Sequence, residues 1–319
     1  MAATMKQGWS KPSTILFATE IPANEKALSF AVAQAREFGA NLILFHVYDT
    51  VVVAESVTSG VRCYDYAATA RAEVNQLEPL ARQVRAEGIP CEIIVRPGLP
   101  ADRILAVLRE RQVDRVVMGT HSPGPIGKLL VGSVAEQVLR SASVPVYIVG
   151  PDVLDGGYRN FAIRTILCAV NMNEASEMVA AFAADLAAQH NARLVLQHVI
   201  KPQERAEILG MCTIADFEMD LLALIPDKVR NEVRVQTIVV PGDPTEELLY
   251  QGRVQQADLI VLGAMGASPF AAIARQGVVY KVLAHSHCPV ITLSPALLAE
   301  SGVRFLQEHR AEASLVGVF

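Results

Sequence analysis

The chain has 319 residues, of which 51% are hydrophobic, 19% are charged and 6% are aromatic. This length exceeds one compact domain and the hydrophobic share excludes a disordered chain, so we expect two globular units with mainly aliphatic cores. Lysine and arginine number 28 against 33 aspartates and glutamates, a formal charge of -5, and neither sign forms a long run. This charge pattern argues against nucleic acid as a partner.

The sequence contains no segment with the length and hydrophobicity of a membrane span. The longest apolar stretch without a charge, Leu259–Ala274, has 16 residues and is interrupted by Ser268 and Pro269. A bilayer core of ~30 Å needs a longer stretch. Residues 1–10 lack the apolar segment of a secretory signal, so we expect a cytoplasmic protein with no membrane contact.

The cysteines predict reduced, structural thiols rather than disulfides or a zinc finger. They are odd in number, far apart in sequence and form no C-x-x-C motif. They are Cys63, Cys91, Cys168, Cys212 and Cys288.

Short β-branched runs alternate with longer helical patterns such as Glu25–Phe38 in the first half of the chain. This alternation is typical of βαβ units on a parallel sheet. The strands that we expect there are Thr14–Thr19, Asn41–Tyr48, Cys91–Arg96, Arg115–Gly119 and Val144–Val149.

The second half repeats the first. Its expected strands, around helical patterns such as Ala175–His190, are Thr165–Val170, Arg193–Ile200, Arg234–Val239, Leu259–Gly263 and Pro289–Leu293. The predicted fold class is therefore α/β, with two tandem doubly wound, five-stranded parallel sheets. A ligand crevice is expected at the carboxyl ends of the strands.

The separation between the two copies changes along the chain. It falls from 152 residues between His46 and His198 to 144 residues between Val116 and Ile260. The first copy therefore holds about eight extra residues. We assign them to Asp49–Tyr66 and expect a mobile flap near the N-terminal crevice.

The repeat sets the domain boundaries. We expect domains at residues 11–150 and 161–295, joined by the linker Gly150–Asn160. The C-terminal tail, residues 296–319, has no counterpart after the first copy. Its Leu297, Leu298, Phe305 and Leu306 could form a short surface helix, but we expect a frayed tail.

The segment after the fourth strand, from Gly119 to Gly132-Ser133, is the best candidate for a ligand site. A glycine at the strand end permits close approach of a ligand, and a helix that begins at Gly132-Ser133 would offer free N–H groups and a positive dipole end to a phosphate. The alternative is structural: Ser133 and Glu136 form a capping box, and Gly119 only makes a tight turn.

These motifs resemble the universal stress protein family, whose ATP-binding members carry G-2x-G-9x-G-(S/T) after the fourth strand. Gly119, Gly132 and Ser133 match that pattern, and Ser122 replaces its second glycine. The resemblance extends to the strand ending His-Val, to Pro-Gly-x-Pro-Ala and to the closing Val-Pro-Val. It implies the fold of the adenine nucleotide alpha hydrolase-like proteins.

The resemblance also implies which residues contact a nucleotide. In the first copy they are Glu20, Val47, Met118, Gly119, His121, Ser122, Gly132, Ser133 and Val134. The second copy would hold a degenerate site at Asn171, Gly263, Gly266, Gln276 and Gly277.

Several positions depart from the ATP-binding pattern. Glu20 and Asn171 stand where ATP-binding members usually have aspartate. In the second copy Gln276 would place a side chain where the phosphate should lie. In the first copy Pro123 and Pro125 lack N–H donors. We therefore expect the N-terminal site to bind adenine nucleotide and the C-terminal site to bind it poorly or not at all.

Family members commonly pair through their closing strands. We therefore expect Val144–Val149 and Pro289–Leu293 to meet within one chain as a pseudo-dimer, which would hide their unpaired backbone groups. Such a chain could also form a homodimer.

Two other functional motifs, a P-loop and a zinc site, match the sequence poorly. The sequence from Ser122 to Lys128 lacks the first glycine and the Ser/Thr of a P-loop, and His285-x-His287-Cys288 lacks a distant fourth ligand for zinc, so no structural metal is expected. His46 and His198 end strands on an apolar face, where histidines with satisfied hydrogen bonds are expected.

The resemblance implies a stress-response regulatory protein that binds ATP, with or without magnesium, and acts on a protein partner that the sequence does not identify. No catalytic residue is assigned. One alternative is a slow ATPase or phosphotransferase, with His121 or Ser133 receiving or positioning the γ-phosphate. The other is a nucleotide-free interaction scaffold.

Overall fold

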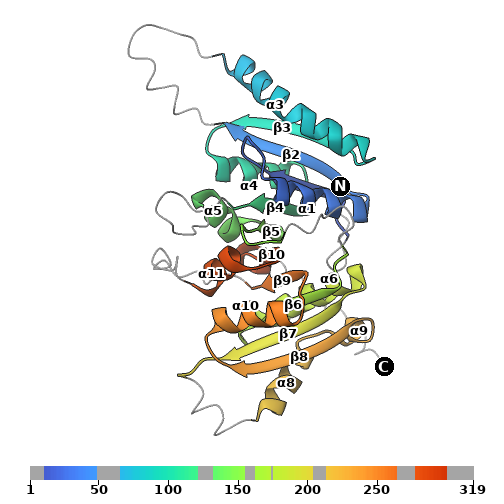
Figure 1. The fold of residues 1–319 in the computed structure, drawn as a ribbon, viewed down its shortest axis with the longest axis vertical. Coiled ribbons are helices and arrows are strands. Elements are labelled where there is room, and N and C mark those ends of the chain that lie inside the picture. The colour runs from blue at the N-terminus through green and yellow to red at the C-terminus, as the bar shows by residue number, and fades with distance from the viewer. Residues whose placement is uncertain are drawn as a thin grey trace, which may run out of the picture.

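The computed structural model describes residues 11–48, 65–120, 132–154, 162–173, 175–203, 213–263 and 277–299, which form one ten-stranded sheet with helices on both faces (Figure 1). The first half contains β1 (Thr14–Ala18), α1 (Glu25–Phe38), β2 (Asn41–Tyr48), α3 (Tyr66–Ala86), β3 (Cys91–Pro97), α4 (Pro100–Glu110), β4 (Arg115–Gly119), α5 (Ser133–Ser141) and β5 (Val146–Val149).

The second half repeats this order. It contains β6 (Thr165–Ala169), α6 (Ser176–His190), β7 (Arg193–Ile200), α8 (Ile214–Ala223), α9 (Asp227–Arg230), β8 (Arg234–Pro241), α10 (Pro244–Val254), β9 (Leu259–Leu262), α11 (Val278–His285) and β10 (Val290–Thr292). The α/β class and the tandem, doubly wound arrangement predicted from the sequence are confirmed.

The strand order is β3-β2-β1-β4-β5-β10-β9-β6-β7-β8. Only β5 and β10 are antiparallel among the described pairs, with Ile148 opposite Val290 and Val146 opposite Thr292. The closing strands therefore meet within one chain, as expected, and join two five-stranded parallel sheets into one. The junction leaves β3 and β8 as the two edges.

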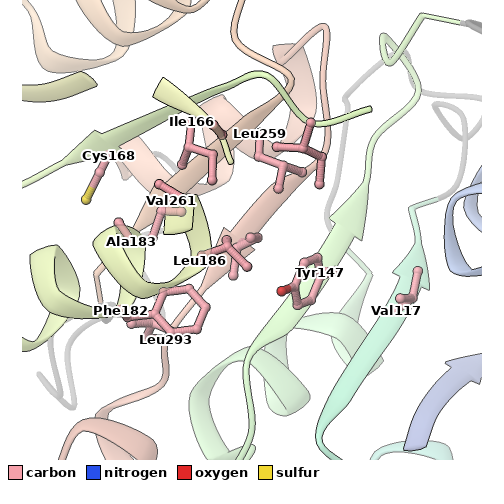
Figure 2. Close-up of a cluster of buried hydrophobic side chains, with 14 of the residues drawn as sticks. Val117, Tyr147, Ile166, Cys168, Phe182, Ala183, Leu186, Leu259, Val261 and Leu293 are labelled. Carbon is pink, nitrogen blue, oxygen red and sulfur yellow. The ribbon is translucent and has the colours of Figure 1, made fainter. Parts of the chain in front are cut away.

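Each face of the sheet carries an apolar core that crosses this junction. Helices α1, α3, α6 and α8 cover one face, and α4, α5, α10 and α11 cover the other. Figure 2 shows side chains from both halves in the first of these cores, including Tyr147 of β5 and Leu186 of α6. Because both side chains are almost fully buried, the halves share a core instead of touching only through the linker.

Polar contacts join the halves as well. Arg115 of β4 is buried and donates from Nη2 to Oε1 of Gln189 over 2.9 Å. Nδ1 of His190 in α6 lies 2.6 Å from Oε1 of Glu37 in α1. These contacts satisfy polar groups that the pseudo-dimer would otherwise bury without partners.

The extra residues of the first copy are divided between two places. The N-cap Asp65 of α3 follows β2 by 17 positions, whereas the N-cap Thr213 of α8 follows β7 by 13. The other four extra residues lie between the N-cap of α3 and β3. There the first copy has the single 21-residue helix α3, whereas the second copy has the shorter helices α8 and α9.

The buried Leu77 of α3 and Leu221 of α8 are again 144 positions apart, so all the extra residues precede Leu77 and four of them fall in the first turn of α3. The assignment to Asp49–Tyr66 stays a prediction. Residues 49–64 of the expected flap lie outside the described residues.

The start of the C-terminal segment is packed. Residues 295–299 are helical, and Leu297 and Leu298 are 5% and 4% exposed. The N–H of Leu297 donates to Oγ of Ser294 over 3.0 Å, and this hydroxyl donates to the carbonyl of Ala142. The expectation of a frayed tail is wrong for these residues, while Phe305 and Leu306 lie outside the described part of the chain. None of the described helices is long and apolar enough to cross a membrane.

Candidate functional site

The carboxyl ends of β1 and β4 form the crevice of the first half. In the strand order β2-β1-β4, Ala18 pairs with Phe45 on one side and with Met118 on the other. The chain leaves neighbouring strands toward opposite faces at this point, which is where open α/β sheets bind ligands. Glu20 follows β1 at this edge and is exposed.

Two of the predicted contact residues pack against the core on one face of the sheet. Met118 is 5% exposed and belongs to the core beneath α4 and α5. Val47 is half-buried and packs against the same core. The side chains of Met118 and Val47 therefore belong to the packed core next to the crevice.

A histidine fixes the segment that carries Glu20. Nδ1 of His46 lies 2.9 Å from the carbonyl of Thr19, and in the second half Nδ1 of His198 lies 3.0 Å from that of Val170. Both histidines thus have the satisfied hydrogen bond expected from the sequence. In each half this hydrogen bond joins the end of the second strand to the residues after the first strand.

Gly119 has a structural reason to be a glycine. A Cβ atom placed on it would lie 2.7 Å from Cγ of Asn24. Asn24 caps α1, because its Oδ1 accepts the N–H of Ala27 over 3.0 Å, and its Nδ2 donates to the carbonyl of Thr120 over 3.5 Å. The sequence analysis missed Asn24, although an asparagine directly before an acidic first turn is a recognisable N-cap signal.

Helix α5 begins without a side-chain cap. Gly132 is the N-cap residue, with φ -61° and ψ 156°, and Ser133 is the first helical residue. Both are exposed, and a Cβ on Gly132 would meet nothing within 4 Å. The capping box of Ser133 with Glu136 is therefore absent, and Oε1 of Glu136 instead accepts from Nη2 of Arg140 over 3.3 Å. The first-turn N–H groups of α5 are left for another acceptor.

The second half has a similar helix start. Gly277 caps α11 with φ -67° and ψ 157°, close to the values of Gly132, and α11 is one residue shorter than α5. Gly277 thus has the N-cap role in α11 that Gly132 has in α5, and Gln276 lies outside the described residues. The described differences between the two crevices are Val278 in place of Ser133 and the exposed Asn171 in place of Glu20.

Glycine also ends the fourth strand of the second half. A Cβ on Gly263 would lie 3.1 Å from Cγ2 of Val179, a less severe contact than the one at Gly119. Val134, the second residue of α5, is partly buried and packs against the core beneath α4 and α5. The other candidate residues lie outside the described part of the chain. They are His121, Ser122 and the nearby Pro123 and Pro125 in the first half, and Gly266 and Gln276 in the second.

The His285-x-His287-Cys288 segment does not gather into a metal site. Nδ1 of His285 lies 3.4 Å from Oδ2 of Asp152, whereas Cys288 is buried beside Ser286. Burial raises the pKa of the Cys288 thiol to about 12. Within the described ranges no group of three His, Cys, Asp or Glu residues could hold a metal ion.

The other described thiols also have raised pKa values. Burial raises the pKa of Cys91 to about 11 and raises that of Cys168 further. Neither these two nor Cys288 forms a disulfide. Because the thiolate is the reactive form, these cysteines are structural.

Comparison with known proteins identifies the family. Residues 12–150 and 162–294 each match the model of the Universal stress protein family. The chain belongs to this family. A universal stress protein of Mycolicibacterium smegmatis is 25% identical over 288 residues, which cover 85% of this chain and 93% of that protein.

Single-unit and structural relatives agree with this assignment. A universal stress protein of Thermus aquaticus is 33% identical over 131 residues, 39% of this chain and 88% of its own length. The crystal structure of a universal stress protein from Archaeoglobus fulgidus has a TM-score of 0.68 at 20% identity, covering 90% of this chain and 97% of that one. The tandem universal stress protein fold therefore extends over nearly the whole chain.

Proposed function

We propose that this tandem universal stress protein binds an adenine nucleotide at the carboxyl ends of β1 and β4 in its N-terminal half. The bound nucleotide would regulate shape or partner choice in a stress response. The observation that carries this proposal is the start of α5, where no side chain caps the first-turn N–H groups and where Gly132 and Ser133 are exposed. A helix N-terminus of this kind favours a phosphate through both its N–H groups and its dipole.

The proposed orientation follows from the chemistry at the two strand ends. The phosphates would lie against Gly132 and the Ser133 hydroxyl. Glu20, an exposed carboxylate after β1, would accept hydrogen bonds from the ribose hydroxyls. The adenine assignment itself comes from the resemblance of the Gly119 to Ser133 segment to the ATP-binding members of the family.

We propose binding without efficient turnover. The polar side chains in the described part of the crevice are Glu20 and Ser133. Ser133 lies at a helix start, and no described general base lies beside it. We therefore assign no residue there to activate a nucleophile. A magnesium ion would be bound through the phosphates of the nucleotide, as is usual for Mg²⁺ at ATP sites.

The first experiment is to identify the ligand carried by the purified protein. Acid-denatured protein is centrifuged and the supernatant is separated by anion exchange, with nucleotide standards. We expect adenine nucleotide at about one equivalent per chain, or binding of added ATP at that ratio if none copurifies. A protein that neither carries nor binds adenine nucleotide would be an interaction scaffold, and the proposal would fail. Formation of ADP from ATP above the rate without protein would instead favour the slow ATPase.

A further inference from the structure

The outer edge of β3 has free backbone groups. β3 ends the sheet, and the N–H of Leu42 in β2 donates to the carbonyl of Pro90 over 2.9 Å. In a parallel ladder the even-numbered residues of β3 then bond to β2. The N–H and C=O groups of Ile93 and Val95 consequently point away from the sheet, where no described strand pairs with them.

This edge is accessible. A groove of about 470 Å³ lies between α3 and β3, and it is lined by residues 92–96 of the strand and by Ala70 and Val74 of α3, among others. Arg71 and Asn75 of α3 and Arg111 complete the lining of the groove. Ile93 and Val95 are only partly buried in it. Long exposed edges are templates for pairing with another strand.

The sequence of this edge is complementary to itself. An antiparallel pairing about a twofold axis at Ile94 would place Glu92 opposite Arg96 of a second copy and Ile93 opposite Val95 of that copy. Because Ile93 and Val95 have the outward backbone groups, these two pairs would exchange four hydrogen bonds. Glu92 and Arg96 then fall in non-hydrogen-bonded pairs, where opposite side chains lie closest.

We propose that a second copy of this chain docks on β3, so that two ten-stranded sheets join edge to edge in a symmetric dimer. Glu92 and Arg96 are both exposed on the face that Ile94 shares with α4. Glu92 already accepts from both Nη atoms of Arg111, at 2.8 and 2.5 Å. Arg96 of the second copy would add a further cation to this pair, and the carboxylate has oxygens enough for both.

The opposite edge lacks this complementarity. The register of β8 against β7 matches that of β3 against β2, which places Gln236 and Val240 at the positions of Glu92 and Arg96. Pairing β8 with its own copy would therefore bring no opposite charges together. Pairing β3 with β8 of another copy would give Glu92 and Arg96 no charged partner on the other copy's strand and would build an open chain of molecules. The charges thus select the symmetric β3 pair.

Charge reversal tests the register. We would measure mass by analytical ultracentrifugation from low to high micromolar concentration for the parent, Glu92→Arg and Arg96→Glu. The parent should be a dimer, and each variant alone should be a monomer because like charges then face each other. An equimolar mixture of the two variants should form a heterodimer, since both cross-strand pairs again join opposite charges.

A matched control on the other edge is Gln236→Arg, which should leave the parent's mass unchanged. Circular dichroism melting shows that each variant folds, and restoration in the mixture cannot arise from misfolded protein. A monomeric parent overturns the proposal. So do single variants that keep the dimer, or a mixture that stays monomeric, because the dimer would then use another surface or register.

Discussion

Substituting Gly132→Asp should strongly weaken nucleotide binding while leaving the stability of the fold unchanged or slightly higher. The backbone of Gly132 is extended, and a Cβ there meets nothing within 4 Å, so an aspartate fits without strain. Aspartate is a better N-cap than glycine by a few tenths of a kcal/mol. The thermal midpoint should therefore stay the same or rise slightly.

The same carboxylate would occupy the first-turn N–H groups that the phosphate needs. Losing one hydrogen bond to a charged group costs about 1.5–3 kcal/mol, equivalent to about ten- to a hundredfold in affinity. Repulsion between the carboxylate and a phosphate at about 4 Å adds up to ~4 kcal/mol near a protein surface. ATP affinity should thus fall by at least about a hundredfold.

Titration calorimetry and thermal melting of one preparation measure both effects. The control is Gly277→Asp, which makes the same change at the start of α11 and should leave the dissociation constant of the N-terminal site unchanged. If Gly132→Asp binds ATP like the parent, the phosphate does not lie at α5. If only Gly277→Asp loses binding, the site belongs to the second half.

Three further predictions concern stability and reactivity. Gly119→Ala should destabilise the protein by about 1–3 kcal/mol in urea unfolding, since its Cβ would press on Asn24, and Gly263→Ala should cost less; equal costs would contradict this packing. Burial lowers the pKa of His287 below its usual 6.5, so the unfolded chain binds more protons and stability should fall as pH drops below 6.5. A His287→Asn variant should show a shallower fall, and a slope equal to the parent's would exclude His287 as a source. The Cys288 thiol, with its pKa raised to about 12, should react with a thiol reagent only after unfolding, and rapid labelling of native protein would contradict its burial.

The sequence predicts the sheet well because its strands are short aliphatic runs between clear breaks. Asn41–Tyr48, Arg115–Gly119 and Arg193–Ile200 have the expected bounds. The closing strands start later than expected, because Pro145 and Pro289 have no N–H for the ladder. Their carbonyls still accept N–H groups from the neighbouring strands, at 3.2 and 3.1 Å.

The candidate site is predicted less completely, because several of its features depend on contacts between distant segments. Nothing in the residues around Gly119 indicates that Asn24, nearly a hundred positions earlier, excludes a side chain there. Likewise, aligning the copies by a fixed offset pairs Gly132 with Gln276. In the structure Gly277 is the N-cap of α11, because α11 starts one residue later relative to its strands.

The most direct test of the account is the number of adenine nucleotides bound per chain. Equilibrium dialysis of nucleotide-free parent protein against labelled ATP measures this number without assuming where the site lies. The account predicts saturation near one equivalent, held by the N-terminal half. Saturation near two would contradict the inequality of the halves, and no binding would contradict the nucleotide site itself.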